Sequence, residues 1–264
     1  MRKKAIRSPR LERKTRKKKI QKAVILSLLG VGILSLSIYA LLQPEFRIQR
    51  IGIDGSESLP REEITSLVKQ GLSGKAVGLI PREHTLLFPK RRLEAAIAAA
   101  FPIFSDVRVA REGLSAVRVS LISRTPYVIW CESSCYFVDE TGFAFATSTK
   151  EADQLYYRFA RNTVATSTPL GRFVAEPQRL RELSTLVQQL EELSLAVSEV
   201  QLGEEEVTAV LRGGARLLLP GTDFDGAVGH LRRLLAEKGL VARAGGGLLV
   251  EYVDLRYGNK IYVK

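Results

Sequence analysis

The sequence predicts an α+β protein with a single N-terminal transmembrane helix, a β-α-α-β-β module and a second domain of mixed strands and helices. Three observations predict this class. Residues 23–42 are apolar and uncharged, strand-like and helix-like segments alternate from residue 45, and strands outnumber helices after residue 126. The predicted boundaries are a basic arm at 1–22, a transmembrane helix at 23–42, a first domain at 45–125 and a second at 126–264.

The net charge of +12 comes from the N-terminal end of the chain. Twelve of the 40 Lys and Arg residues lie in residues 1–22 beside one acidic residue, which leaves 28 basic and 27 acidic residues for the rest. The body is therefore nearly neutral and does not have the charge of a nucleic-acid-binding domain. The arm itself fits binding to anionic lipid or nucleic acid, or an otherwise disordered signal that only sets topology.

The apolar run from Ala23 to Leu42 is twenty residues long. At about 1.5 Å per residue a helix of this length spans roughly 30 Å, the thickness of a bilayer core. A buried soluble helix rarely stays apolar on all faces, and a cleaved signal peptide has a shorter core that ends in small residues, where Tyr39 stands here. Only Arg47 and Arg50 follow closely, so the positive-inside rule predicts a cytoplasmic N-terminus and an external body.

The first domain reads as a strand, two helices and a hairpin. Pro60 fits the first turn of a helix, and Glu62 and Glu63 suit its positive end. The expected elements are a strand at 46–54, a helix at 60–72, an irregular loop at 73–88, a helix at 89–101 and a hairpin at 105–123 that turns at Glu112-Gly113. This order resembles a POTRA domain, the polypeptide-transport-associated module.

The second domain is expected to contain more strands than helices. Gly142 marks a turn between strands, residues 147–168 are rich in Ser and Thr and predict a loop, and Glu204-Glu205-Glu206 predicts a solvated turn. The expected elements are two or three strands at 127–146, a helix at 176–193, a hairpin at 199–221 that turns at Gly213-Gly214, a helix at 226–240 and a turn at 245–247.

The last segment, Val250–Lys264, alternates with the period of a half-buried strand. One parity is shared by Val253, Leu255, Tyr257, Ile261 and Val263, and the other by Asp254, Arg256, Lys260 and Lys264, so we expect the charged residues to face solvent. Gly258-Asn259 suits a bulge or a tight turn. We expect the segment to join the sheet at or near an open edge, which either merely completes the sheet or offers a template for a partner strand.

Two cysteines, Cys131 and Cys135, flank Glu132-Ser133-Ser134 between strand-like runs. If these three residues form a hairpin loop, the cysteines face each other at a separation that suits a disulfide, and an exported domain could keep such a bond. A metal site would need more ligands, but the only histidines, His84 and His230, are distant in the sequence.

No pattern of residues predicts catalysis. The sequence lacks H-E-x-x-H, G-x-S-x-G and P-loop motifs, and its glycine pairs occupy turns rather than a strand-to-helix junction. His230 is expected to be a structural or surface residue of an amphipathic helix. We therefore predict no enzyme activity, no cofactor and no metal.

The combined features resemble the bacterial cell-division protein family FtsQ/DivIB. The features are the basic arm, the single apolar helix, the POTRA-like module, the stretch YFVDETGFAF at Tyr136–Phe145 and the closing VDLRYGNKIYV at Val253–Val263. The link between modules in the family commonly reads E-R-x-P, whereas here it reads Ser123-Arg124-Thr125-Pro126. The long 73–88 loop and the cysteine pair are not general family features.

The resemblance implies a non-enzymatic scaffold of the divisome in the cytoplasmic (inner) membrane, at the division septum. It implies recruitment of the single-pass division proteins FtsB and FtsL, and through them an influence on septal peptidoglycan synthases. It also implies a partner-binding strand, in which the D-L-R-Y match selects two side chains and the following residues supply main-chain pairing. The residues so implied are Arg256, Tyr257, Gly258, Asn259, Lys260, Ile261 and Tyr262.

Two other functions stay open at this point. A POTRA-bearing component of protein translocation or envelope assembly would resemble this chain only over residues 45–125, and it normally continues into a long series of barrel strands. The third possibility, an anchored exported enzyme, is disfavoured by the absence of catalytic motifs.

Overall fold

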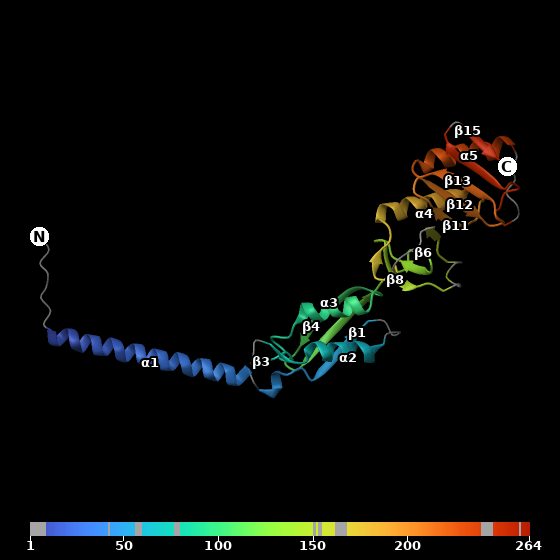
Figure 1. The fold of residues 1–264 in the computed structure, drawn as a ribbon. Coiled ribbons are helices and arrows are strands. Elements are labelled where there is room, and N and C mark those ends of the chain that lie inside the picture. The colour runs from blue at the N-terminus through green and yellow to red at the C-terminus, as the bar shows by residue number, and fades with distance from the viewer. Residues whose placement is uncertain are drawn as a thin grey trace, which may run out of the picture. The chain divides into compact units, whose positions relative to one another are not determined.

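A computed structural model describes residues 9–41, 43–55, 60–76, 80–149, 152, 155–161, 168–238, 245–258 and 260–264. The chain divides into two compact units (Figure 1), Met1–Ala95 with Arg108–Ser120, and Ala96–Val107 with Leu121–Lys264. The predicted α+β class with one N-terminal apolar helix is confirmed. The domain boundary at residue 126 stays a prediction.

The N-terminal helix α1 runs from Pro9 to Leu41. Within it, Lys18–Ser37 is long and apolar enough to cross a membrane. The helix also includes the basic residues from Arg10 to Lys22, so the expectation of a disordered arm is wrong for this part, because long Lys and Arg side chains are good helix formers. The first eight residues and Leu42 lie outside the described residues.

The β-α-α-β-β order expected for the first domain is present. Its elements are the 3₁₀ turn η1 (Pro44–Phe46), β1 (Arg50–Asp54), α2 (Arg61–Leu72), β2 (Lys75–Ala76), β3 (Ile80–Pro81), α3 (Lys90–Ala100), β4 (Phe104–Glu112) and β5 (Ala116–Ser123). Three strands form a sheet in the order β1-β5-β4, with β1 parallel to β5. The 73–88 loop contains the short pair β2–β3, and its residues 77–79 lie outside the described residues. Identity with a POTRA domain remains a prediction.

The second unit is built on a large mixed sheet. Its elements are β6 (Val128–Cys131), β7 (Cys135–Val138), β8 (Phe143–Thr147), β9 (Arg158–Arg161), β10 (Arg172–Phe173), α4 (Pro177–Glu192), β11 (Val197–Leu202), β12 (Glu206–Leu211), β13 (Arg216–Pro220), α5 (Phe224–Lys238), β14 (Tyr252–Tyr257) and β15 (Lys260–Val263). Among the described residues the ten strands follow the order β10-β8-β7-β6-β9-β11-β12-β13-β14-β15. The strands β10 and β15 therefore occupy its two edges.

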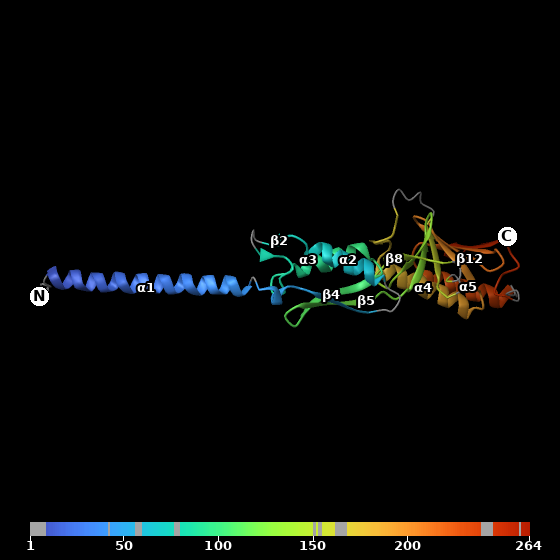
Figure 2. The ribbon, with the colours of Figure 1, turned by 90° about the horizontal axis from the view of Figure 1, so that it is seen from below.

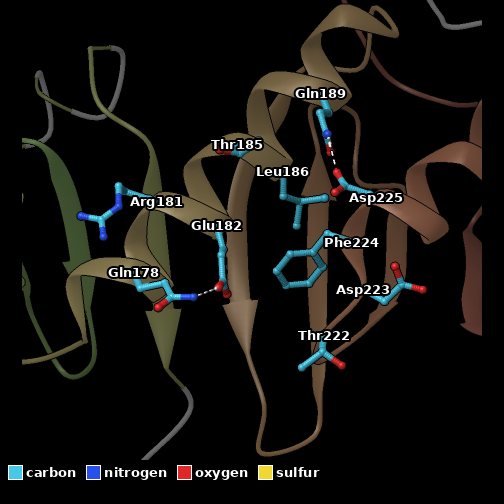
Figure 3. Close-up of a pocket in the computed structure, with 10 residues that line it drawn as sticks. All are labelled: Gln178, Arg181, Glu182, Thr185, Leu186, Gln189, Thr222, Asp223, Phe224 and Asp225. Carbon is cyan, nitrogen blue, oxygen red and sulfur yellow. Dashed lines mark hydrogen bonds between the residues drawn. The ribbon is translucent and has the colours of Figure 1, made fainter.

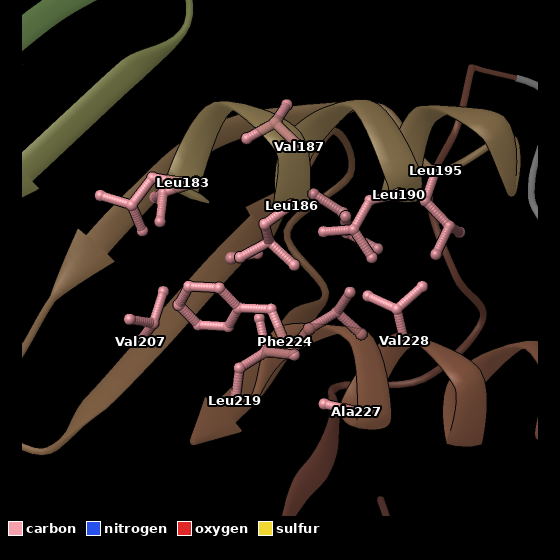
Figure 4. Packing of buried hydrophobic residues seen from close by; sticks show 14 of the residues in the cluster. Leu183, Leu186, Val187, Leu190, Leu195, Val207, Leu219, Phe224, Ala227 and Val228 are labelled. Carbon is pink, nitrogen blue, oxygen red and sulfur yellow. The ribbon is translucent and has the colours of Figure 1, made fainter. Parts of the chain in front are cut away.

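Both helices of this unit cover the same face of the sheet (Figure 2). Pro177 occupies the first turn of α4, and Leu183, Leu186 and Leu190 follow at helical spacing and are buried. They point toward Phe224 and neighbouring residues of α5 above the strands (Figure 4). The alternate residues of the strands complete this core. In the described part of this unit no α-helix covers the opposite face of the sheet, which is called the helix-free face below.

The loop expected at residues 147–168 is wrong for Arg158–Arg161, which forms β9. This strand pairs in parallel with both β6 and β11 and so joins the two halves of the sheet, with Phe159 fully buried. Four residues are too few for a clear period-two signal, because only one of them enters the core. The hairpin expected at 199–221 is instead three antiparallel strands, β11, β12 and β13, with the predicted turn at Gly213-Gly214 between the last two.

Candidate partner-binding edge

The closing segment forms a hairpin at one edge of the sheet. The strand β14 pairs in parallel with β13, and β15 folds back on β14 as the last strand in the sheet order. Tyr257 pairs with Lys260 across a two-residue turn, where Gly258 takes a φ of +60°. Glycine suits this left-handed conformation, so the glycine-containing turn expected here forms a hairpin. Asn259, also expected in this site, lies outside the described residues.

The backbone pairing determines which amides of β15 point away from the sheet. Lys264 and Tyr252 exchange backbone hydrogen bonds, with Lys264 N donating to Tyr252 O over 3.2 Å and Tyr252 N to Lys264 O over 3.3 Å. In an antiparallel pair such residues alternate with residues whose N–H and C=O groups point outward. The backbone groups of Ile261 and Val263 therefore face the free edge, where an additional strand could pair with them.

The side chains of β15 point alternately to the two faces of the sheet. Ile261 packs against the helix-covered core. Tyr262 lies opposite Asp254 on the helix-free face, and it contacts Tyr257 edge to face with ring centroids 5.7 Å apart. Tyr257 and Tyr262 are 56% and 52% exposed. Two exposed, mutually fixed tyrosines beside unpaired backbone groups make a surface suited to a partner strand.

Arg256 is held by acidic residues of this chain. Its Nε lies 3.0 Å from Asp254 Oδ1 and its Nη2 2.7 Å from Asp254 Oδ2, while Nη1 donates to Glu206. The hydrogen bonds from Arg256 lower the pKa of Asp254, although burial acts in the opposite direction. The same bonds raise the pKa of Arg256. The guanidinium therefore ties β14 to β12, and its position 5.5 Å from the ring of Tyr257 supports that exposed side chain.

The expectation that Asp254 faces solvent is wrong, since only 5% of it is exposed. The paired Arg256 covers it, and a register shift between Asp254 and Tyr257 interrupts the strict alternation of the strand. Sequence reasoning also missed Glu206, which begins β12 and binds Arg256 instead of belonging only to a solvated acidic turn. A bulge and a long-range ion pair leave no local signal in the sequence.

The stretch around Asp139 performs a structural task. Asp139 Oδ1 accepts hydrogen bonds from Thr141 N at 2.9 Å, Thr141 Oγ1 at 2.6 Å and Phe143 N at 3.1 Å, and Oδ2 accepts one from Arg124. Burial acts to raise the pKa of Asp139, but these bonds keep it below its usual value. Arg124 also lies over the ring of Phe143 at 4.2 Å. The carboxylate thus fixes the β7–β8 turn to Arg124 in the segment between β5 and β6.

Cys131 and Cys135 close the β6–β7 hairpin. They are directly paired across the two strands with Cα atoms 4.1 Å apart, and the structure joins them as a disulfide. Their side of the sheet is the helix-free face, where Ile129 and Ala152 form a small separate cluster with Cys131. The bond therefore stabilises the hairpin next to this cluster. Several strands separate this hairpin from β15 in the sheet.

A hollow of about 490 Å³ lies between α4 and the start of α5 (Figure 3). Most of its lining residues are polar, and four of them are bonded in pairs, because Gln189 Nε2 donates to Asp225 Oδ1 over 2.7 Å and Gln178 Nε2 to Glu182 Oε1 over 3.1 Å. Asp223 accepts the N–H of Gly226 at the start of α5, which is the bond of a helix cap. The hollow holds no nucleophile paired with a base, and in the described part of the chain no three His, Cys, Asp or Glu side chains gather as metal ligands. His230 is half-buried in α5.

Comparison with known proteins identifies the second unit. The family model described as "Cell division protein FtsQ/DivIB, C-terminal" matches residues 128–256, from the start of β6 almost to the end of β14. Among curated proteins, none matches the chain. The hairpin turn and β15 follow directly after the matched residues. Residues 128–256 thus identify the chain as a member of the FtsQ/DivIB family of cell division proteins.

Proposed function

We propose that this cell division protein is a non-enzymatic, membrane-anchored scaffold of the divisome, in which the β14–β15 hairpin binds a strand of a partner protein. The proposed partners are FtsB-like and FtsL-like single-pass division proteins, and through them the septal peptidoglycan synthases. The observation that carries this proposal is the free edge of β15, with the outward backbone groups of Ile261 and Val263 beside two exposed tyrosines.

The geometry supports addition of a strand in a defined way. A partner strand pairing with Ile261 and Val263 would extend the sheet by main-chain hydrogen bonds. Its side chains on the helix-free face would meet Tyr257 and Tyr262, which are rigid aromatic anchors that lose little conformational entropy on binding. Arg256 acts here as a positioning residue, because it binds Asp254 and Glu206. Lys260 is exposed beside the turn and available to an acidic residue of the partner.

The main-chain part of this proposal is tested with Val263→Pro. Proline removes the outward N–H of residue 263 and leaves the inward hydrogen bonds of its neighbours, so the hairpin should fold. Val263→Ala trims the side chain similarly and keeps the N–H. We expect Val263→Pro to weaken binding of the full-length chain to FtsB-like and FtsL-like partners by about tenfold, the value of one lost hydrogen bond, and Val263→Ala to bind almost like the parent.

The side-chain part is tested with Tyr257→Ala. We expect it to weaken partner binding by at least about thirtyfold, which corresponds to about 2 kcal/mol for an aromatic hot spot. The matched control is Phe173→Ala, because Phe173 is an exposed aromatic residue on β10 at the opposite edge of the sheet. Equal binding by the parent, Tyr257→Ala and Val263→Pro would place the docking surface elsewhere and leave β15 with only a structural role.

Depletion of the protein in its host separates this function from the alternatives. A divisome scaffold is required for septum formation, so depletion should give filamentous cells, and a fluorescent fusion should form a band at midcell. Export or envelope-assembly defects without filamentation would favour the translocation function instead.

A further inference from the structure

The 73–88 loop is fixed to the segment that follows α1. Ile48 N donates to Glu83 O and Thr85 N to Phe46 O, each over 2.8 Å. The ring of His84 is buried and stacks on that of Phe46 with centroids 5.9 Å apart. These contacts lie within the first unit and hold residues 83–85 beside residues 46–48.

The tip of the β4–β5 hairpin joins the same place. Thr85 Oγ1 lies 2.8 Å from Phe46 O and 2.5 Å from Leu114 O, so its proton can be donated to either carbonyl. Gln49 N donates to Ser115 O over 2.8 Å. Three segments of the chain therefore meet at Thr85, and one of them leads directly to the membrane helix.

The chain limits how far this meeting point can lie from the end of α1. Phe46 lies five positions after Leu41, so at about 3.5 Å per position the two cannot be more than roughly 17 Å apart. The 3₁₀ turn at Pro44–Phe46 shortens the distance further. The loop and the hairpin tip therefore stay close to a membrane that α1 crosses.

Three leucines are exposed at this point. Leu86, Leu87 and Leu114 are 51%, 47% and 56% exposed, although Thr85, which binds both segments, is buried. Single exposed leucines are common on soluble proteins. Here two fixed segments next to a membrane anchor expose three leucines. Together they form an apolar patch whose exposure to water is unfavourable.

The segments that meet at Thr85 and lead into α3 are rich in basic residues. Residues 44–50 and 82–92 contain six Arg or Lys residues and two Glu. Lys90, Arg91 and Arg92 begin α3, which has no acidic residue in its first turn. Positive charges at this end of a helix oppose its dipole, so helix stability does not account for them. Within the described part of the chain neither Arg91 nor Arg92 forms an ion pair.

We infer that Leu86, Leu87 and Leu114, together with Arg91 and Arg92, form a lipid-docking surface that holds the first unit against the bilayer that α1 enters. The leucines would enter the interfacial layer, and the guanidinium groups would pair with anionic headgroups. This inference rests on membrane anchoring by α1 and is independent of the partner-binding edge. Charge and proximity to the anchor both favour lipid over a protein as the occupant.

The test measures how deeply each position enters the bilayer. A nitroxide label is placed on Leu87→Cys, Leu114→Cys or Leu249→Cys in the full-length chain, in vesicles of equal parts phosphatidylglycerol and phosphatidylcholine. The chain without an added cysteine gives the background. Leu249 is the matched control because it is an exposed leucine of the second unit. We expect the labels at 87 and 114 to collide with oxygen and to be shielded from a water-soluble nickel chelate, and the label at 249 to be open to nickel.

Two further variants separate the parts of the inference. Leu29→Cys lies in the middle of α1 and reports anchoring itself. A label at 29 shielded from nickel with a label at 87 open to it would overturn lipid docking alone, whereas both labels open would also overturn the anchor. Each basic residue is worth roughly a fivefold change in association with an anionic surface, so Arg91→Gln together with Arg92→Gln should lower docking by about 25-fold. Equal shielding at 87 with and without phosphatidylglycerol would overturn the role of the arginines. Shielding that requires an added protein would replace lipid by a protein partner.

Discussion

At the scale of single residues, the ion pair between Arg256 and Asp254 stabilises the edge hairpin. Arg256→Ala leaves a buried carboxylate without its partner and should lower the free energy of unfolding by about 3 kcal/mol. Asp254→Asn leaves Arg256 paired with Glu206 and partly in water, so this variant should lose about half as much unfolding free energy as Arg256→Ala. Urea unfolding followed by the fluorescence of Trp130 measures both, because this single tryptophan is buried in the second unit. Equal stability of the parent and Arg256→Ala would contradict the structural role.

The same pair predicts how stability depends on pH. Because the pKa of Asp254 is lowered in the folded state, its contribution is present above the pKa of about 3.9 of an unfolded Asp and disappears as the pH falls through the lower folded value. The difference in unfolding free energy between the parent and Asp254→Asn should therefore be constant from pH 7 to about pH 5 and shrink below pH 4. A difference that is the same at pH 3 and pH 7 would show that the ionised carboxylate contributes nothing.

Gly142 allows a matched comparison of two glycines in the second unit. Both Gly142 and Gly214 have positive φ, at +85° and +91°. A Cβ on Gly142 would lie 1.9 Å from the carbonyl oxygen of Ala175, whereas one on Gly214 meets nothing within 4 Å. Gly142→Ala should therefore destabilise by about 4 kcal/mol or more, and Gly214→Ala only by the conformational strain of about 1–2 kcal/mol. Similar losses in both variants would exclude the close approach to Ala175.

At the scale of elements, the sequence predicted long periodic segments and missed short ones. The helices α2, α3, α4 and α5 lie close to the expected residues, since each repeats buried apolar residues over several turns. The strands β9 and β10 have four and two residues, and their places depend on partners far away in the chain. Tertiary pairing of this kind decides a short strand, and the local sequence does not contain it.

The candidate site shows the same division. The terminal strand and its glycine turn have a local pattern and were predicted, and the structure adds that the segment folds back so that β15 alone forms the edge. The burial of Asp254 and the recruitment of Glu206 were missed, because an ion pair between β12 and β14 joins residues 50 positions apart. The edge could therefore be predicted from the sequence, but the side chains that support it could not.

A further prediction concerns the two cysteines of the β6–β7 hairpin. We expect Cys131 and Cys135 to be bonded in the protein isolated from its host. Intact-mass analysis after alkylation should show no added alkyl group without reduction and two after reduction. The loop between the cysteines is short, so reduction should lower the unfolding free energy by no more than about 2 kcal/mol. Uptake of two alkyl groups by the unreduced protein would show free thiols.

At the scale of the whole molecule, the family match and α1 fit a membrane-anchored cell division protein. The charge asymmetry also favours one orientation of α1 across the membrane, because the basic residues precede the apolar stretch and belong to the same helix. Basic residues close to the end of an apolar helix hold that end on the cytoplasmic side. A helical arm keeps these charges within a few turns of the membrane surface.

We predict that residues 1–22 are cytoplasmic and residues 45–264 external. Protease added outside cells, or outside spheroplasts where an outer membrane exists, should digest the body and spare a tag at the N-terminus. The matched variant replaces four neighbouring basic residues, Arg16, Lys17, Lys18 and Lys19, by glutamine and should increase the fraction of inverted molecules, because these charges lie next to the apolar stretch. Replacement of four basic residues of α4 and α5, Arg179, Arg181, Arg232 and Arg233, changes the total charge equally and should leave the orientation unchanged, since they lie far from the N-terminal helix in the sequence. A body protected in the parent would reverse the topology and would place the β15 edge on the side opposite to external partners.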